Sequence, residues 1–189
     1  VLGDYFLHWP ATAPGRRQMA MLLGSNLGNL DERGAVALLQ RIRAQLHDGD
    51  VLLLGLDLLK DPRVIHAAYD DAEGVTAAFN LNLLRRLNRE LGMNFDLGRF
   101  AHFASFNPLD GAMRSFLVST VAQSVSCTVL DREFHFARGE AIYTEQSQKY
   151  SLPMIERLAQ LSGFENARLI TDPDAGYALV VWRRPVGGR

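Results

Sequence analysis

The chain has 189 residues, of which 48% are hydrophobic and 22% are charged, and its formal net charge is −1. This length and polarity are typical of a soluble globular protein that buries a hydrophobic core. The 20 basic and 21 acidic side chains nearly cancel, which argues against a protein that binds nucleic acid through excess positive charge. No apolar run approaches the roughly 20 residues of a membrane-spanning helix. We therefore expect neither nucleic acid nor a membrane among its partners.

The composition gives little support to metal or disulfide chemistry. Cys127 is the single cysteine, so the sequence allows neither an internal disulfide nor a cluster of thiolate ligands. The histidines lack the spacing of metal ligands, and no metal site is predicted. The chain begins at Val1 rather than at a methionine and opens with no signal peptide. We expect a cytoplasmic protein in which a further N-terminal segment precedes Val1.

The first predicted elements are a strand, a helix and a second strand. Residues 18–23 and 51–58 are apolar runs without alternation, which is typical of parallel strands covered on both faces of the sheet. Asp31 is a suitable N-cap for the helix between them. Apolar residues recur at helical spacing after it, at Ala35, Leu38, Leu39, Ile42 and Leu46. Together these elements predict a βαβ unit with a right-handed crossover.

Two helices and a loop are predicted next. Asp61-Pro62 begins the first helix, and Gly74 interrupts it. The second helix is predicted to be amphipathic and to end at Gly92, because apolar residues recur four apart. They are Phe79, Leu83, Leu87 and Leu91. Residues 94–111 contain several turn signals and are predicted to be loop.

The remainder has mainly strand composition. Strands are predicted at residues 115–120, 123–130, 133–136, 167–171 and 177–182. Ser151-Leu152-Pro153 opens a helix, and Gly163 ends it. The predicted fold class is therefore α/β, with part of a doubly wound sheet and an additional, more antiparallel α+β portion.

Two loops follow the predicted parallel strands, at the end of an open α/β sheet where ligands bind. They are residues 24–29 and residues 57–61. In the first, Gly24 and Gly28 allow close backbone approach, and Asn29 offers hydrogen-bond donors and acceptors. This loop lacks the spacing of a phosphate-binding loop, and a plain Gly-rich turn explains it equally well.

Glu145 and Ser147 form a second candidate site. In an extended segment their alternation places both side chains on one face. A carboxylate beside a hydroxyl can hold a polar ring that carries an N–H group. The alternative is a pair of solvent-facing side chains. The acidic run at residues 70–73 is interpreted as a solvated helix end rather than a cation site.

Strings in order along nearly the whole chain resemble the histidine-specific Nα-methyltransferases of ergothioneine biosynthesis, which use S-adenosylmethionine. They are Gly3-Asp4-Tyr5, Leu23-Gly24-Ser25-Asn26-Leu27-Gly28-Asn29, Gly49-Asp50, residues 52–61, Ala68-Tyr69-Asp70-Asp71, residues 74–80, Asn88-Arg89-Glu90-Leu91, Gly139-Glu140, residues 144–150 and Thr171-Asp172-Pro173. The resemblance implies a partial Rossmann-like class I methyltransferase sheet that lacks its first half. The Gly-rich turn that binds the cofactor in that family has no counterpart here.

The resemblance also implies a substrate site for a small amino acid. Gly24 and Asn29 match loop residues at the substrate, and the asparagine holds its amino-carboxylate end. Tyr69 matches a tyrosine bonded to the substrate carboxylate, while Glu145 and Ser147 match the pair that contacts the imidazole ring.

For the cofactor S-adenosyl-L-methionine, the resemblance implies that Asp4 and Tyr5 hold the adenine. No residue is assigned as a catalytic base. The resemblance divides the chain into residues 1–62, the C-terminal half of the methyltransferase core, residues 63–150, the substrate-binding helices and strands, and residues 151–189, the closing helix and final strands.

The expected function is therefore N-methylation of the α-amino group of L-histidine or a related amino acid. Met113-Arg114-Ser115 departs from the Ile-Glu-Met of the family, whose methionine packs on the substrate ring. A more polar pocket at Ser115 would suit another small amine, so one alternative is a methyltransferase of such an amine. The other alternative is a non-catalytic or incomplete chain of this fold that binds a ligand or partner.

Overall fold

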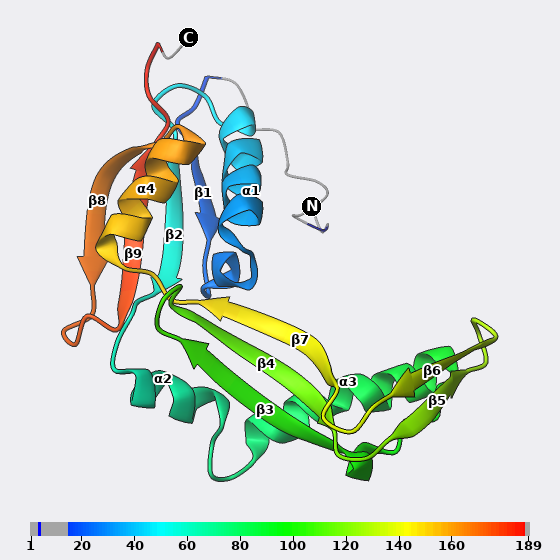
Figure 1. Ribbon diagram of the computed structural model, residues 1–189. Helices are drawn as coiled ribbons and strands as arrows, with labels where there is room; N and C mark the ends of the chain where they lie inside the picture. Colours follow the sequence, from blue (N-terminus) through cyan, green and yellow to red (C-terminus); the bar gives the residue numbers. More distant parts are fainter. Residues whose placement is uncertain (1–3, 5–14, 188–189) are drawn as a thin grey trace. The chain divides into compact units, whose positions relative to one another are not determined.

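The computed structural model describes residue 4 and residues 15–187. The chain divides into two compact units (Figure 1). Unit 1 comprises residues 1–60 and 147–189, and unit 2 comprises residues 61–146. Each unit has its own sheet.

Unit 1 is built on a four-stranded sheet in the order β1-β2-β9-β8. Its strands are β1 (Met19–Leu22), β2 (Val51–Asp57), β8 (Glu165–Thr171) and β9 (Tyr177–Arg183). β1 and β2 are parallel, whereas β9 is antiparallel to both of its neighbours. The predicted strand–helix–strand unit and the final pair of strands are confirmed.

The helices of unit 1 begin and end at local signals. α1 (Glu32–Gln45) begins after Asp31, whose side chain accepts a hydrogen bond from the Gly34 N–H at 2.7 Å. α4 (Leu152–Ser162) begins after Ser151, whose hydroxyl accepts from the Met154 N–H. Both caps satisfy backbone donors that the first turn of a helix leaves unpaired.

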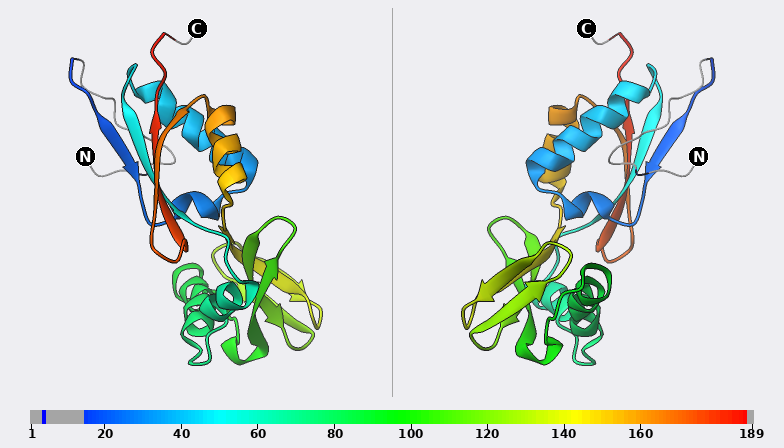
Figure 2. Two further views of the ribbon diagram at one scale, coloured as in Figure 1. Left: turned by 90° about the vertical axis from the view of Figure 1, so that its left-hand side faces the viewer. Right: turned by 90° about the vertical axis from the view of Figure 1, so that its right-hand side faces the viewer.

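Both described helices of unit 1 lie on one face of its sheet (Figure 2). They contact each other, and Arg157 on α4 pairs with Glu32 on α1 at 3.0 Å. Met19 and Met21 of β1 are 55% and 58% exposed. The expectation that both parallel strands are covered on both faces is therefore wrong for β1 in the described residues. An apolar run without alternation does not report how many faces are covered.

The core of unit 1 lies between this sheet and its two helices. Leu39 and Ile42 of α1, Leu54 of β2 and Trp182 of β9 are fully buried in it. Phe164, which follows α4, packs on the Trp182 ring with centroids 5.7 Å apart. The helical periodicity predicted for residues 35–46 is confirmed, because the apolar positions of α1 form the face that meets the sheet.

Unit 2 begins with two helices. α2 (Pro62–Tyr69) begins after its N-cap Asp61, and α3 (Val75–Leu91) lies between its caps Gly74 and Gly92. The predicted start of the first helix and the predicted end of the second are confirmed, whereas α2 ends at Tyr69, before Gly74. Both helices pack against the strands β3 (Phe100–Asn107) and β4 (Ala112–Ser119). A short 3-10 turn, η2 (Leu97–Arg99), leads from α3 into β3.

Five strands complete unit 2. A three-stranded sheet has the order β3-β4-β7, and β5 and β6 form a separate hairpin. The strands are β3 (Phe100–Asn107), β4 (Ala112–Ser119), β5 (Gln123–Cys127), β6 (Arg132–Phe136) and β7 (Ala141–Gln148). Residues 94–111 were predicted to be loop, and β3 corrects this. Its eight residues pair along their whole length with β4, a long-range contact that the turn signals around it obscure.

The apolar stripe predicted for α3 is also partly wrong. Phe79 is 73% exposed and Leu83 is 38% exposed, whereas Asn80 and Leu84, one position later, are buried. Leu84 belongs to the core of unit 2 together with Phe95 and Phe100. The buried face of α3 is therefore rotated by one residue from the predicted one.

The α/β class and the more antiparallel second portion are confirmed. Among the described helices, none combines the length and the apolar character needed to cross a membrane.

Candidate functional site

A polar cluster lies at the carboxyl end of β2 in unit 1. Asp57, the last residue of β2, accepts hydrogen bonds from Lys60 Nζ and Lys149 Nζ, each at 2.7 Å. Lys149 Nζ also donates to Ser147 Oγ at 2.8 Å. Lys149 is 2% exposed, and the Asp57 carboxylate compensates its buried charge. The cluster thus ties a buried Ser147 to the end of the central strand.

The Gly-rich loop after β1 is held against the same strand end. Ser25 adopts the left-handed conformation with φ 57°, and its Oγ accepts from the Asp57 N–H at 3.0 Å. Residues Asn26–Asn29 form a 3-10 turn, η1. A Cβ at Gly28 would lie 2.9 Å from the carbonyl oxygen of Gln148. The turn can therefore approach the segment that follows Ser147 only because residue 28 has no side chain.

These contacts bring together three of the predicted site residues of unit 1. Gly24 and Asn29 are exposed at the two ends of the loop, and Ser147 is buried next to the residue that Gly28 touches. The three lie at the carboxyl end of the parallel pair β1 and β2, where open α/β sheets bind ligands.

Glu145 lies on β7 in unit 2, and its side chain is exposed. It lines a cleft of about 360 Å³ between β7 and α3. The other lining residues are Phe79, Asn80, Asn82, Leu83, Arg86 and Thr144. The exposed residues of the α3 stripe therefore face a cleft that contains a predicted ring-binding carboxylate.

Tyr69 is the last residue of α2. It is half-buried and packs against the small core of Ile65, Ala104 and Met113. Its backbone carbonyl accepts a hydrogen bond from His102 Nε2 at 2.8 Å. The end of α2 is thus fixed both by packing and by a polar contact with β3.

His102 is in turn held by Asn80 of α3. Because the Tyr69 carbonyl can only accept, Nε2 carries the ring hydrogen and Nδ1 is an acceptor. Asn80 Nδ2 supplies the donor at 2.9 Å and also donates to the Phe116 carbonyl at 3.1 Å. The two carbonyl groups fix the orientation of the amide and the tautomer of the ring.

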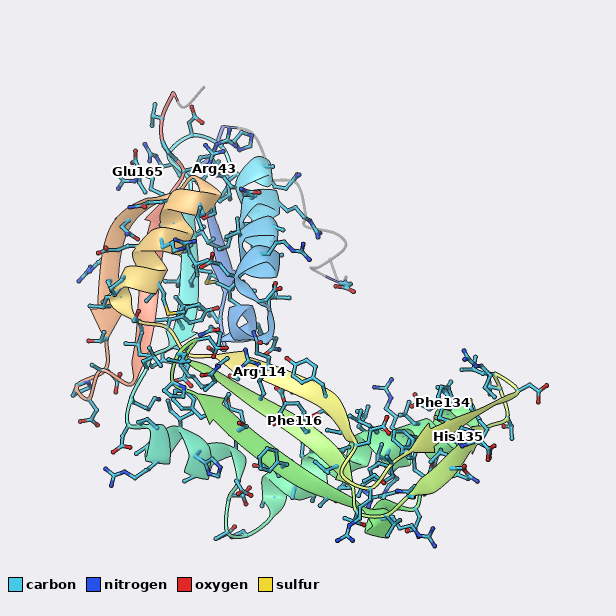
Figure 3. All side chains as sticks on the ribbon, viewed as in Figure 1. Arg43, Arg114, Phe116, Phe134, His135 and Glu165 are labelled. Atoms are coloured by element: carbon cyan, nitrogen blue, oxygen red, sulfur yellow. The ribbon has the colours of Figure 1, made fainter. Side chains whose placement is uncertain are left out.

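The strand β4 carries the residues that depart from the family pattern. Met113 is buried in the small core with Ile65, and Ser115, two residues further along β4, is also buried. The Ser115 carbonyl accepts from Thr144 Oγ1 of β7 at 2.9 Å. Arg114, labelled in Figure 3, pairs with Asp110 at 2.7 Å. The Asp110 carboxylate raises the pKa of the Arg114 guanidinium.

The predicted cofactor residues are placed only in part. Asp4 is exposed, and Tyr5 lies outside the described residues. The predicted site draws residues from both units, so its assembly stays a prediction. Residue 4 and residues 15–187 contain no group of three or more His, Cys, Asp or Glu side chains arranged to hold a metal ion.

Sequence reasoning missed three residues of these arrangements, namely Lys149, Asn80 and His102. Lys149 directly follows β7 and stands two residues after Ser147, and that alternation was the signal that could have joined it to the pair. No local signal marked Asn80 or His102, since both act across long-range contacts between α3 and β3.

The family described as histidine-specific methyltransferase, SAM-dependent, matches residues 1–184. The chain is similar to histidine N-alpha-methyltransferase of Mycolicibacterium smegmatis, with 39% identity over 183 residues, which are 96% of this chain and 57% of that protein. It is also similar to ergothioneine biosynthesis protein 1 of Neurospora crassa, with 29% identity over 79% of this chain and 17% of that protein.

Among solved structures, one similar chain is a S-adenosylmethionine-dependent methyltransferase from Clostridium acetobutylicum. The TM-score is 0.47 and the identity 10%, over 98% of this chain and 64% of that one. With 57% of that protein covered, the chain spans little more than half the length of the Mycolicibacterium relative.

Proposed function

This chain belongs to the family of histidine-specific, SAM-dependent methyltransferases, and we propose that it is part of an enzyme that methylates the α-amino group of L-histidine. The family match confirms the resemblance indicated by the sequence strings. The substrate and the residue roles below are parts of the proposal.

The hydrogen bonds that hold Ser147 and the loop after β1 at the end of β2 are the observation that supports the proposal. Ser147 is a buried hydroxyl that a lysine–aspartate pair ties to the carboxyl end of β2. The loop that carries Gly24 and Asn29 is anchored to the same strand end through Ser25. A solvent-facing serine or a plain turn would need no such arrangement, so these contacts support a binding role over the structural alternative.

The proposed roles follow from the chemistry of methyl transfer. When bound, S-adenosylmethionine supplies a methyl group on a sulfonium, which is already activated for transfer. The protein then needs mainly to orient the amine. We assign Asn29 and Tyr69 to the amino-carboxylate end of histidine, and Glu145 and Ser147 to its ring.

For the cofactor, Asp4 offers an exposed carboxylate that suits the amino group of adenine. Tyr5 is assigned with it on the resemblance alone. In this proposal, residues 1–62 are the C-terminal half of the methyltransferase core, residues 63–150 the substrate-binding helices and strands, and residues 151–189 the closing helix and final strands. A cytoplasmic location fits a chain whose single cysteine, Cys127, is free and buried.

A second candidate is a methyltransferase of another small amine. Its support is Ser115, a small polar residue in the place of the ring-packing methionine of the family. Activity that survives removal of the substrate carboxylate would favour this candidate over the amino-acid enzyme.

The test is calorimetry on the full-length protein with L-histidine and S-adenosylhomocysteine, followed by a methyl-transfer assay. We expect histidine to bind, and Glu145→Gln to weaken binding about tenfold through loss of a charged hydrogen-bond acceptor. Glu165→Gln, at an exposed residue that begins β8, is the matched control and should bind as the unchanged protein does. Absence of binding by any amino acid would refute the proposal.

A further inference from the structure

We propose that a cavity in unit 1 binds an internal water molecule, which joins the Tyr150 hydroxyl to the first turn of α1. The described residues that line the cavity all belong to unit 1, and none of them is assigned to histidine or to the cofactor. The inference therefore goes beyond the proposed function and does not depend on which amine is methylated.

Tyr150 carries a buried hydroxyl that needs a partner. The residue is 2% exposed, and no residue that the structure describes forms a hydrogen bond with this hydroxyl. Burial raises the pKa of the hydroxyl, so the group stays protonated at neutral pH and remains a donor. A buried polar group that loses its bonds to water without a replacement destabilises the fold. Such groups are therefore nearly always paired, and ordered water is one of their partners.

The backbone of Tyr150 is already paired on both sides. Its N–H donates to the Asp57 carbonyl, and its carbonyl accepts from the Leu59 N–H, each at 2.9 Å. These bonds tie the segment that follows β7 to the end of β2. The hydroxyl is thus the remaining polar group of Tyr150.

Tyr150 lines a cavity of about 30 Å³ between the start of α1 and the start of α4. Roughly 10–15 Å³ is enough for one water molecule. Leu30, Ala35, Met154 and Leu158 form its apolar walls. A water molecule therefore fits the space.

Glu32 supplies the second partner for the water molecule. It is the first residue of α1 and lines the same cavity. Its side chain is 54% exposed, and its two carboxylate oxygens accept from Arg157 at 3.0 and 3.1 Å. A carboxylate has about four lone-pair positions, so Arg157 leaves room for a further donor. The water molecule accepts from Tyr150 and donates to Glu32, which links the segment after β7 to α1.

Deleting the hydroxyl tests the site, because the sign of the effect depends on whether water is bound. Tyr150→Phe keeps the ring and removes only the hydroxyl. If the hydroxyl bonds to water, we expect the unfolding constant from urea titrations of the full-length protein to rise about fivefold. If the hydroxyl has no partner, the substitution relieves an unsatisfied group and the constant falls. Tyr143→Phe is the control, because Tyr143 is 55% exposed, and it should leave the constant unchanged.

Filling the cavity separates bound water from other effects of the substitution. Ala35→Val adds two methyl groups at a lining residue and should displace the water molecule. Ala35→Val itself changes the packing, so a double-mutant cycle compares only the effect of Tyr150→Phe in the two backgrounds. With Val at residue 35, Tyr150→Phe should no longer raise the unfolding constant, because the hydroxyl has already lost its partner.

A crystal structure of the full-length protein, at a resolution that shows ordered water, provides the direct measurement. We expect a water molecule about 2.7–2.8 Å from the Tyr150 hydroxyl oxygen and its loss in Tyr150→Phe. This measurement also decides the question if Ala35→Val does not fold.

An unfolding constant that falls or stays unchanged in Tyr150→Phe would overturn the inference. A crystal structure without water at the hydroxyl, or additive effects in the cycle, would do so as well. None of these results bears on the proposed function, which is tested separately by histidine binding.

Discussion

His102 acts at the residue scale as a connection between three elements of unit 2. Its ring accepts from Asn80 of α3 and donates to the end of α2, and it stands on β3 itself. Replacing the ring with an apolar one removes a hydrogen-bond partner from both the Asn80 amide and the Tyr69 carbonyl. The cost of such unsatisfied polar groups exceeds the gain from making the hydrogen bonds.

We therefore expect His102→Phe to destabilise the protein by about 1–3 kcal/mol in chemical denaturation. His135→Phe is the control, because the His135 side chain on β6 is 74% exposed. Its effect should be within about 0.5 kcal/mol. Equal effects of the two substitutions would contradict the role assigned to His102.

At the scale of elements, Gly28 sets how closely the turn η1 approaches the segment that follows Ser147. A Cβ there would meet the Gln148 carbonyl oxygen at 2.9 Å and the Gln148 nitrogen at 3.2 Å, both backbone atoms that move only with the segment. We expect Gly28→Ala to cost about 1–3 kcal/mol and to weaken histidine binding. Gly98→Ala, whose nearest contact would be a side-chain oxygen at 3.4 Å, should be nearly neutral. Urea titrations of the two variants measure both changes in stability.

The start of α3 depends on Asp71. Its carboxylate accepts from the N–H groups of Thr76 and Val75, each at 2.8 Å. Hydrogen bonds from Thr76 and Val75 lower the pKa of Asp71 from 3.8 to about 2. A carboxyl group whose pKa falls on folding stabilises the protein above its unfolded pKa, and this stabilisation is lost as the pH drops.

The unchanged protein should accordingly lose stability between pH 4 and pH 2 in part through Asp71. In Asp71→Ala this part of the pH dependence should be absent, while Asp70→Ala should retain it. Melting temperatures measured across this pH range provide the test. Parallel curves for the unchanged protein and Asp71→Ala would disprove the assignment.

The elements that the sequence predicted well are those with local signals. Asp31 and Ser151 cap α1 and α4 through hydrogen bonds within the first turn, so their positions can be inferred from neighbouring residues. β3 has no such signal, because it forms by pairing with β4. The buried face of α3 was missed by one residue for a related reason: Asn80 is buried by its bond to the Phe116 carbonyl, a contact outside the helix.

The candidate site likewise contains residues that the sequence could identify and a contact that it could not. Residue types and a family resemblance could identify Gly24, Asn29 and Ser147, and the structure places them at one end of the unit 1 sheet. The ion pair between Lys149 and Asp57, which anchors the neighbourhood of Ser147, could not be predicted. Lys149 and Asp57 are 92 residues apart in the chain, and only the fold makes them neighbours.

At the scale of the whole molecule, each unit has its own buried apolar cluster. Leu54 is fully buried in the cluster of unit 1, and Leu84 is fully buried in the main cluster of unit 2. We expect Leu54→Ala and Leu84→Ala each to cost about 2–5 kcal/mol.

Hydrogen exchange with mass spectrometry should locate the two effects. Leu54→Ala should raise exchange chiefly in β2 and α1, and Leu84→Ala chiefly in α3 and β3. Uniform acceleration across the chain in both variants would show instead that the two clusters open as one cooperative structure.

The pairing of one carboxylate with two lysines has an electrostatic consequence. Lys60 and Lys149 place two ammonium groups on the single Asp57 carboxylate where β2 ends. Ammonium groups gathered in this way attract a small molecule that carries a carboxylate and raise the frequency of its encounters with the protein. Dissolved ions screen this attraction over about 10 Å at 0.1 M, so capture should slow as salt is added while the final contacts stay the same.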